Sequence, residues 1–200
     1  MLNDRDVLAA EPSLFSEACF TSQILCRGTN GIVAGTQFTA SGVDFSASGV
    51  TAGGVIWLES VDGSIKGGFE IVTLIDSTHL TLSILRSDPA GSAIPVGSAS
   101  GLTWSVKTYA PQIAAAEIVL SHRLRCLPGW EAATETLETI DNADTVKVVW
   151  LYLLLADLFG ALYGDYPAYT AESAAAAWGS HKAKRIWYRG TAERTISLLK

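Results

Sequence analysis

The pattern of hydrophobic and polar residues changes twice along the 200-residue chain. Residues 4–27 carry apolar residues at helical spacing, with Leu14 and Phe15 among them. Residues 30–109 instead contain short alternating or β-branched runs separated by Gly, Ser and Asp, which is typical of strands and tight turns. Helical spacing returns over residues 111–189. The pattern therefore predicts an α+β fold in which a long β segment interrupts a helical chain.

The β segment contains roughly five or six short strand-like runs. The clearest are residues 55–58, 80–85 and 102–106. Glycine and serine separate these runs at close intervals. Because closure removes exposed strand edges, we expect a small closed or nearly closed β-barrel.

The helical parts on either side of the β segment are expected to share one core. This predicts a helical bundle with a small β-barrel inserted between its first and second main helices. The predicted parts are a bundle of residues 1–29 and 110–190, a barrel of residues 30–109, and a C-terminal tail of residues 191–200.

The composition favours a protein that covers part of its surface with other subunits. Hydrophobic residues make up 48% of the chain and charged residues only 17%, against roughly 25% charged in an ordinary soluble protein. The net charge of −6 argues against a broad phosphate-binding surface. The most apolar stretch, residues 146–162, is interrupted by Lys147 and Asp157 and is shorter than the about 20 apolar residues of a membrane span. We therefore expect no membrane contact.

No motif of a catalytic or cofactor site is present. The chain lacks GxxxxGK[ST], GxGxxG after a strand, and GxSxG. Its three histidines, His79, His122 and His181, have no nucleophile placed beside them by the sequence. We therefore predict no catalytic residue, no cofactor and no enzyme activity, with an active site assembled only in space as the alternative.

Three cysteines and one histidine raise the question of a metal site. Cys19 and Cys26 are seven residues apart, and His122 and Cys126 are four apart, so each pair would share a helix face. Packed together, the four could bind zinc. Structural zinc usually uses short CxxC spacing, whereas buried free cysteine is common in cores, so we predict no metal site and leave open whether the four meet. The odd number of cysteines also favours a reducing compartment.

Several segments together resemble a known family. They are EPSLF at residues 11–15, FTASGVDFSASGVTAGGVIWLES at 38–60, GGFEIVTLIDSTHLTLSILRSDPAG at 67–91, and YAPQIAAAEIVLSHRL at 109–124. In their order and in their short local sequences they resemble the head-to-tail connector (adaptor) proteins of tailed bacteriophages. The resemblance covers most of the chain and is clearest up to Leu127.

The resemblance implies a structural virion protein of the phage neck. Such proteins form a ring of about a dozen subunits with closed cyclic symmetry beneath the portal. The ring joins capsid to tail, receives the next neck or tail protein, and lets DNA pass as cargo during genome ejection. The location implied is the head–tail junction of the virion, after synthesis in the host cytoplasm.

Two sets of residues are candidates for function under this resemblance. The first would dock on the portal: Trp187, Tyr188, Ile196, Leu198 and Leu199. The second would face the channel, where negative charge repels DNA phosphates: Glu131, Glu135, Glu138, Asp141 and Asp144. The alternative functions are a tail-completion or stopper protein, or an adhesin-like module that binds host glycan.

Overall fold

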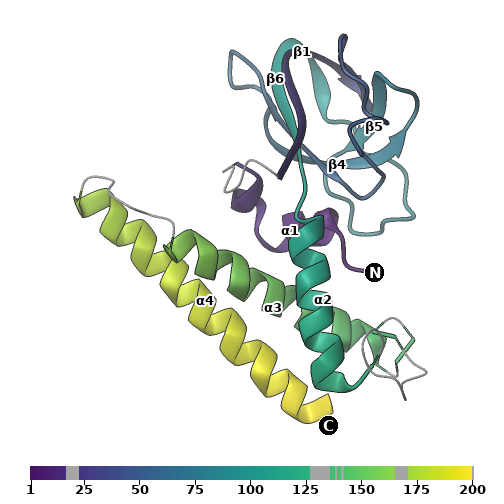
Figure 1. The fold of residues 1–200 in the computed structure, drawn as a ribbon. Coiled ribbons are helices and arrows are strands. Elements are labelled where there is room, and N and C mark those ends of the chain that lie inside the picture. The colour runs from purple at the N-terminus through teal and green to yellow at the C-terminus, as the bar shows by residue number, and fades with distance from the viewer. Residues whose placement is uncertain (17–22, 127–135, 138, 141, 165–170, 200) are drawn as a thin grey trace. The chain divides into compact units, whose positions relative to one another are not determined.

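The computed structural model describes residues 1–16, 23–126, 136–137, 139–140, 142–164 and 171–199. It contains two compact units (Figure 1). The β-barrel unit comprises Asn3–Tyr109, and the helical unit comprises Met1–Leu2 with Ala110–Lys200.

The β-barrel unit is built from strands that are all antiparallel to their neighbours. They are β1 (Ile24–Gly35), β2 (Gln37–Thr39), β3 (Val55–Glu59), β4 (Lys66–Leu74), β5 (His79–Ser83) and β6 (Gly97–Lys107). Their order around the barrel is β1-β2-β5-β4-β3-β6. The long strand β1 closes the barrel because it pairs with β2 near its end and with β6 from Ile24 opposite Lys107 to Gly35 opposite Gly97.

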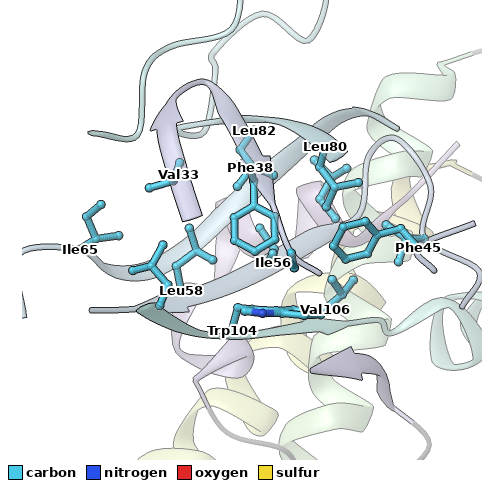
Figure 2. Close-up of a cluster of buried hydrophobic side chains, with 14 residues drawn as sticks. Val33, Phe38, Phe45, Ile56, Leu58, Ile65, Leu80, Leu82, Trp104 and Val106 are labelled. Atoms are coloured by element: carbon cyan, nitrogen blue, oxygen red, sulfur yellow. The ribbon is translucent and has the colours of Figure 1, made fainter. Parts of the chain in front are cut away.

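The barrel interior is filled by alternate side chains of the strands, as a two-residue period requires. Leu102, Trp104 and Val106 of β6 are buried at every second position. The indole of Trp104 meets the rings of Phe38 and Phe45 edge-on, with centroids 5.8 and 5.6 Å away (Figure 2). These three aromatic side chains form the centre of the core, and aliphatic residues from the other strands surround them.

In β1, Gly31 makes room for this aromatic centre. A Cβ atom there would lie 2.8 Å from both Phe38 Cε2 and Trp104 Cδ1.

We expect Gly31→Ala to lower the free energy of unfolding of the barrel by about 1–3 kcal/mol, because the rings are packed too tightly to move aside. The matched control is Gly67→Ala in β4, where the nearest atom is Phe69 Cζ at 4.0 Å and the change is expected to be neutral or stabilising. Equal urea midpoints for the two variants would contradict this account.

The N-terminal segment belongs to the β-barrel unit. Helix α1 (Asp4–Ala10) is capped by the side chain of Asn3, and η1 (Pro12–Phe15) is a single 3₁₀ turn. The Arg5 amide donates to the Gly53 carbonyl, and the Leu8 side chain occupies the space left by the missing side chain of Gly68, with Cδ1 2.7 Å from where a Cβ would lie. These contacts hold α1 on the barrel wall.

The end of β6 and the residues just after it also hold this segment. The Tyr109 amide donates to Asp4 Oδ1 at 2.6 Å, and its hydroxyl donates to the Leu14 carbonyl at 2.7 Å. Lys107 Nζ donates to the Phe15 carbonyl at 2.7 Å. Burial raises the pKa of the Asp4 carboxyl, against the hydrogen bonds from Tyr109 and Thr108, which lower it.

The predicted fold class is therefore wrong. We expected a helical bundle with the barrel inserted between its first two main helices, but the long helices all follow the barrel. Residues 24–27, expected to be helical, begin strand β1, where the backbone pairs with the end of β6. The remaining N-terminal helical segments are only seven and four residues long, too short to be stable except by packing on another surface.

The helical unit contains α2 (Ala110–Leu124), α3 (Ala143–Gly164) and α4 (Ala171–Leu199). Helix α3 supplies most of its core, with Val149, Trp150, Leu155 and Phe159 at most 2% exposed. Such an apolar helix is expected where neighbours cover more than one side. The α4 helix runs through Gly190 without a break, so the helix end expected there is wrong.

Trp150 joins α3 to α2. Its side chain is buried, and Nε1 donates to the Ile113 carbonyl at 3.0 Å. We expect Trp150→Phe to lower the free energy of unfolding of the helical unit by about 1–3 kcal/mol, because the bond and part of the packed ring are lost. Hydrogen exchange of peptides from α2 and α3 would report it. Unchanged exchange rates would show that this bond contributes nothing.

Candidate functional site

The outward face of α2 carries no acidic residue, lysine or arginine. Ala114, Ala115, Ile118 and Val119 are exposed and lie on one side of the helix, and we name them the α2 stripe. Ile118 is 51% exposed. The opposite side of the same helix packs inward through Ile113, Ala116 and Leu120. Helix α2 thus has two apolar faces, and only one of them is covered within its own unit.

Helix α4 has a similar outward face. Ala183, Ile186, Trp187 and Gly190 lie together on it, and we name them the α4 stripe. Ile186 and Trp187 are 62% and 54% exposed, which is unusual for side chains of this size. Arg194 continues the same face one turn further on. The inward face of the helix is marked by Tyr188, Ala192 and Ile196, which are buried.

An aromatic cluster beneath the α4 stripe fixes the position of its large side chain. The Tyr152 ring of α3 lies 5.7 Å from the Trp187 ring and 5.5 Å from the Tyr188 ring. Tyr188 also stacks on Phe159, with the rings 6.0 Å apart and 4° from parallel. The Lys184 ammonium lies 4.9 Å from the centre of the Phe159 ring. Trp187 is therefore supported on one edge while its remaining surface is available for a partner.

The residues expected to dock on the portal divide between the two faces of α4. Trp187 and Leu198 point outward, and Leu198 is 84% exposed. Tyr188 and Ile196 are buried against the helical unit, and Leu199 is partly buried. Residues 191–199 are therefore the end of a packed helix, and only part of the expected set can contact a partner without unpacking it.

The structure describes one of the acids expected to face a channel. Asp144 is exposed in the first turn of α3. With Lys147 it borders a hollow of about 220 Å³ in the helical unit, whose other lining residues are Met1, Leu2, Leu137, Ala143 and Trp150. Glu131, Glu135, Glu138 and Asp141 lie outside the described residues.

The cysteine and histidine residues fall in different units. Cys26 lies in strand β1, not on a helix, whereas His122 and Cys126 belong to the helical unit. Cys19 lies outside the described residues. Burial raises the pKa of the Cys26 thiol to about 11, so the thiolate that a metal or a nucleophilic role requires is scarce near neutral pH. Within the described ranges, no group of three or more His, Cys, Asp or Glu could hold a metal ion.

One buried charge cluster lies in the β-barrel unit. Glu70 of β4 is 2% exposed and accepts from Arg86 Nη2 at 2.7 Å and pairs with Arg5 Nε at 3.0 Å. Burial alone would raise the pKa of Glu70, but the hydrogen bonds from Arg86 and the charges of Arg5 and Arg86 outweigh it and leave that pKa lowered. Because Arg5 belongs to α1 and Arg86 follows β5, the cluster ties these two segments to the sheet.

Two other acidic groups stabilise turns. Asp62 accepts from the Ser60 and Ser64 hydroxyls and from the Ser64 amide, which lower its pKa to about 2. The Thr78 amide and His79 likewise lower the pKa of Asp76 to about 2. His79 Nδ1 lies 2.8 Å from Asp76 Oδ1 within the turn between β4 and β5. This histidine and carboxylate thus complete a turn, and their contacts provide no reason to assign them catalysis.

Sequence reasoning missed the α2 stripe. From spacing alone we would expect Ile118 to share one inward face with Ile113, Ala116 and Leu120, but the structure places it on the opposite side. The signal was the small number of charged residues in the helix, since α2 carries only Glu117 and Arg123 of that kind. An apolar set too wide for one face indicates a second buried face.

No helix among the described residues has the length and apolar character needed to cross a membrane. Comparison with protein-family models, with curated proteins and with solved structures found no match to this chain.

Proposed function

We propose that this chain is a structural virion protein of the neck of a tailed bacteriophage. It forms a ring beneath the portal, connects the capsid to the tail, and lets DNA pass. Its partners are further copies of itself, the portal protein, and the next neck or tail protein. We choose this class of protein because the order of the chain's segments resembles that of connector proteins.

The observation that carries the proposal is the exposed apolar surface of the helical unit. Large apolar side chains on α2 and α4 point away from the unit's own core. Exposed apolar residues that gather on one face mark protein–protein contact sites, whereas scattered ones need no explanation. Two such faces on one small unit suit a protein that contacts more than one neighbour.

The acidic link supports the proposed channel. Residues 131–144 contain five acids and no base, which is the charge a channel needs if DNA is to pass without binding. A ring in which Glu131, Glu135, Glu138, Asp141 and Asp144 all lie on the outer surface would remove this part of the proposal.

Portal docking can be tested at the end of α4. We expect the purified chain to co-sediment with a portal ring. Leu198→Asp should abolish this binding, because the complex would then bury a charge where the wild type buries an apolar side chain that is exposed in the free chain. Ser197→Asp is the matched control, since it places the same charge on the neighbouring exposed position. Absence of wild-type binding, or equal binding by Leu198→Asp, would contradict docking through this surface.

A further inference from the structure

We propose that the α4 stripe of one copy packs against the α2 stripe of the next copy, and that this contact closes the ring. The inference rests on the proposed ring-forming function and names the surfaces that build it. The contact is heterologous, because each copy contributes a different helix to each of its two interfaces. Repetition of one heterologous contact generates a closed ring when its rotation closes.

The two stripes match in length and in shape. The α2 stripe, with Pro111 and His122 at its ends, extends over about 18 Å at the helical rise, and the α4 stripe from Ala183 to Arg194 extends over about the same length. The α2 stripe begins with the small side chains of Ala114 and Ala115, whereas the α4 stripe presents the large side chain of Trp187. A protruding aromatic residue set against small residues allows two helices to approach closely.

Gly190 provides a second, independent observation. It lies inside α4, where glycine is the least favourable residue other than proline. A Cβ atom at this position would meet no described atom within 4 Å, so packing against the described part of the chain does not require a glycine. Close approach of another helix from outside would require one. The residue lies in the α4 stripe between Ile186 and Arg194, where the neighbouring copy is expected to cross.

The charges beside the stripes are complementary. Arg194 continues the α4 stripe and donates to Thr191 Oγ1 at 3.1 Å, but no described carboxylate pairs with it. Glu117 borders the α2 stripe, and no ion pair of it is found in the part of the chain that the structure describes. Among the described residues, the cation beside one stripe and the anion beside the other have no ion-pair partner, which suits pairing between copies and would also set the direction of the contact.

An interface of two different stripes is preferred to a symmetric one. A two-fold interface between two α4 stripes would give Arg194 no anion from the facing stripe, and one between two α2 stripes would give Glu117 no cation. It would also leave the other stripe exposed in every dimer. Pairing α4 with α2 covers both stripes in every copy of a closed ring.

Cross-linking of mixed copies tests the inference. In full-length chains with Cys19, Cys26 and Cys126 replaced by serine, one variant carries Ile118→Cys and another carries Ile186→Cys, each with a different tag. We expect a short bis-maleimide to give covalent dimers containing one chain of each kind when the two are co-expressed, and no dimers from either variant alone. Dimers from a single variant alone, or rings that give no mixed dimers, would overturn the inference.

Gly190→Leu provides a test that does not depend on cross-linking. Because a Cβ atom at this position would meet no described atom within 4 Å, the variant should keep the helix content of the wild type, while light scattering shows loss of the ring. Lys182→Leu adds the same side chain at an exposed α4 position outside the stripe and should keep the ring. If the Gly190→Leu variant still formed a ring, the proposed contact would be contradicted. A wild-type monomer would instead contradict the ring itself, and with it the proposed function.

Discussion

Replacing Trp104 by alanine is expected to lower the free energy of unfolding of the β-barrel unit by about 3–5 kcal/mol. The indole is 2% exposed and meets two other buried rings edge-on (Figure 2). The backbone at Gly28 and Gly31 approaches the same side chain so closely that a Cβ atom at either position would lie within 2.9 Å of it. Removing the indole therefore leaves a cavity that the rigid strands around it cannot fill.

The matched control is Trp57→Ala in the neighbouring strand. Trp57 lies next to Leu58, the residue paired with Trp104, but it is only partly buried. We expect a loss less than half as large, because water can fill the space that its side chain leaves. Urea unfolding followed by hydrogen exchange of barrel peptides would measure both. Equal losses for the two variants would show that the interior indole is not the centre of the core.

Replacing Glu70 by alanine is expected to lower the free energy of unfolding of the same unit by about 3–5 kcal/mol. The change removes the buried carboxylate that pairs with the guanidinium groups of both Arg5 and Arg86. The control is Glu59→Ala, which breaks an exposed pair with Lys66 and should cost less than about 1 kcal/mol. The urea concentration at the midpoint of barrel unfolding, measured for each variant, would distinguish the two losses. A loss for Glu70→Ala as small as that of Glu59→Ala would contradict the buried-cluster account.

The same cluster makes the barrel sensitive to acid. Because the folded-state pKa of Glu70 lies below its ordinary value of 4.5, its contribution is fully present above that pH and is lost as the pH falls through the folded-state pKa. Glu70→Gln should therefore lose less stability than the wild type between neutral pH and pH about 3. Parallel pH profiles for the two proteins would show that another group controls the acid transition.

The strands of the barrel were accessible from the sequence because their signals are local. Alternation over residues 80–85 and 102–106 reflects side chains that point by turns into and out of the barrel, and β5 and β6 lie there. The closed order of the strands depends on pairing between residues far apart in the chain, as between Ile24 and Lys107. No local pattern specifies such a pairing.

The N-terminal segment was misassigned for a related reason. Leu14 and Phe15 fit a helical pattern, but what decides their place is long-range contact with Tyr109, whose ring meets that of Phe15 edge-on at 5.2 Å. These contacts join the segment to the barrel, and the four residues after Gln23 pair as a strand. Tertiary packing thus determines whether a short apolar segment belongs to a helical bundle or to a sheet.

The candidate surface was only partly accessible from the sequence. The set predicted to dock on the portal contains Trp187 and Leu198, which are exposed, but also Tyr188 and Ile196, which pack inward. In α4, apolar and polar residues occur on every side of the helix, so its sequence does not show which face packs against the core of the unit. The partner helix α3 decides this, because Phe159 and Tyr152 cover Tyr188.

The measurement that tests the central claim most directly is the molar mass of the purified full-length chain by light scattering, paired with images of the particles. The account predicts a closed ring with a central channel and a mass that is a whole multiple, about twelve-fold, of the 21.2 kDa chain. A chain that remains a monomer at high concentration, both alone and with a portal ring, would contradict it.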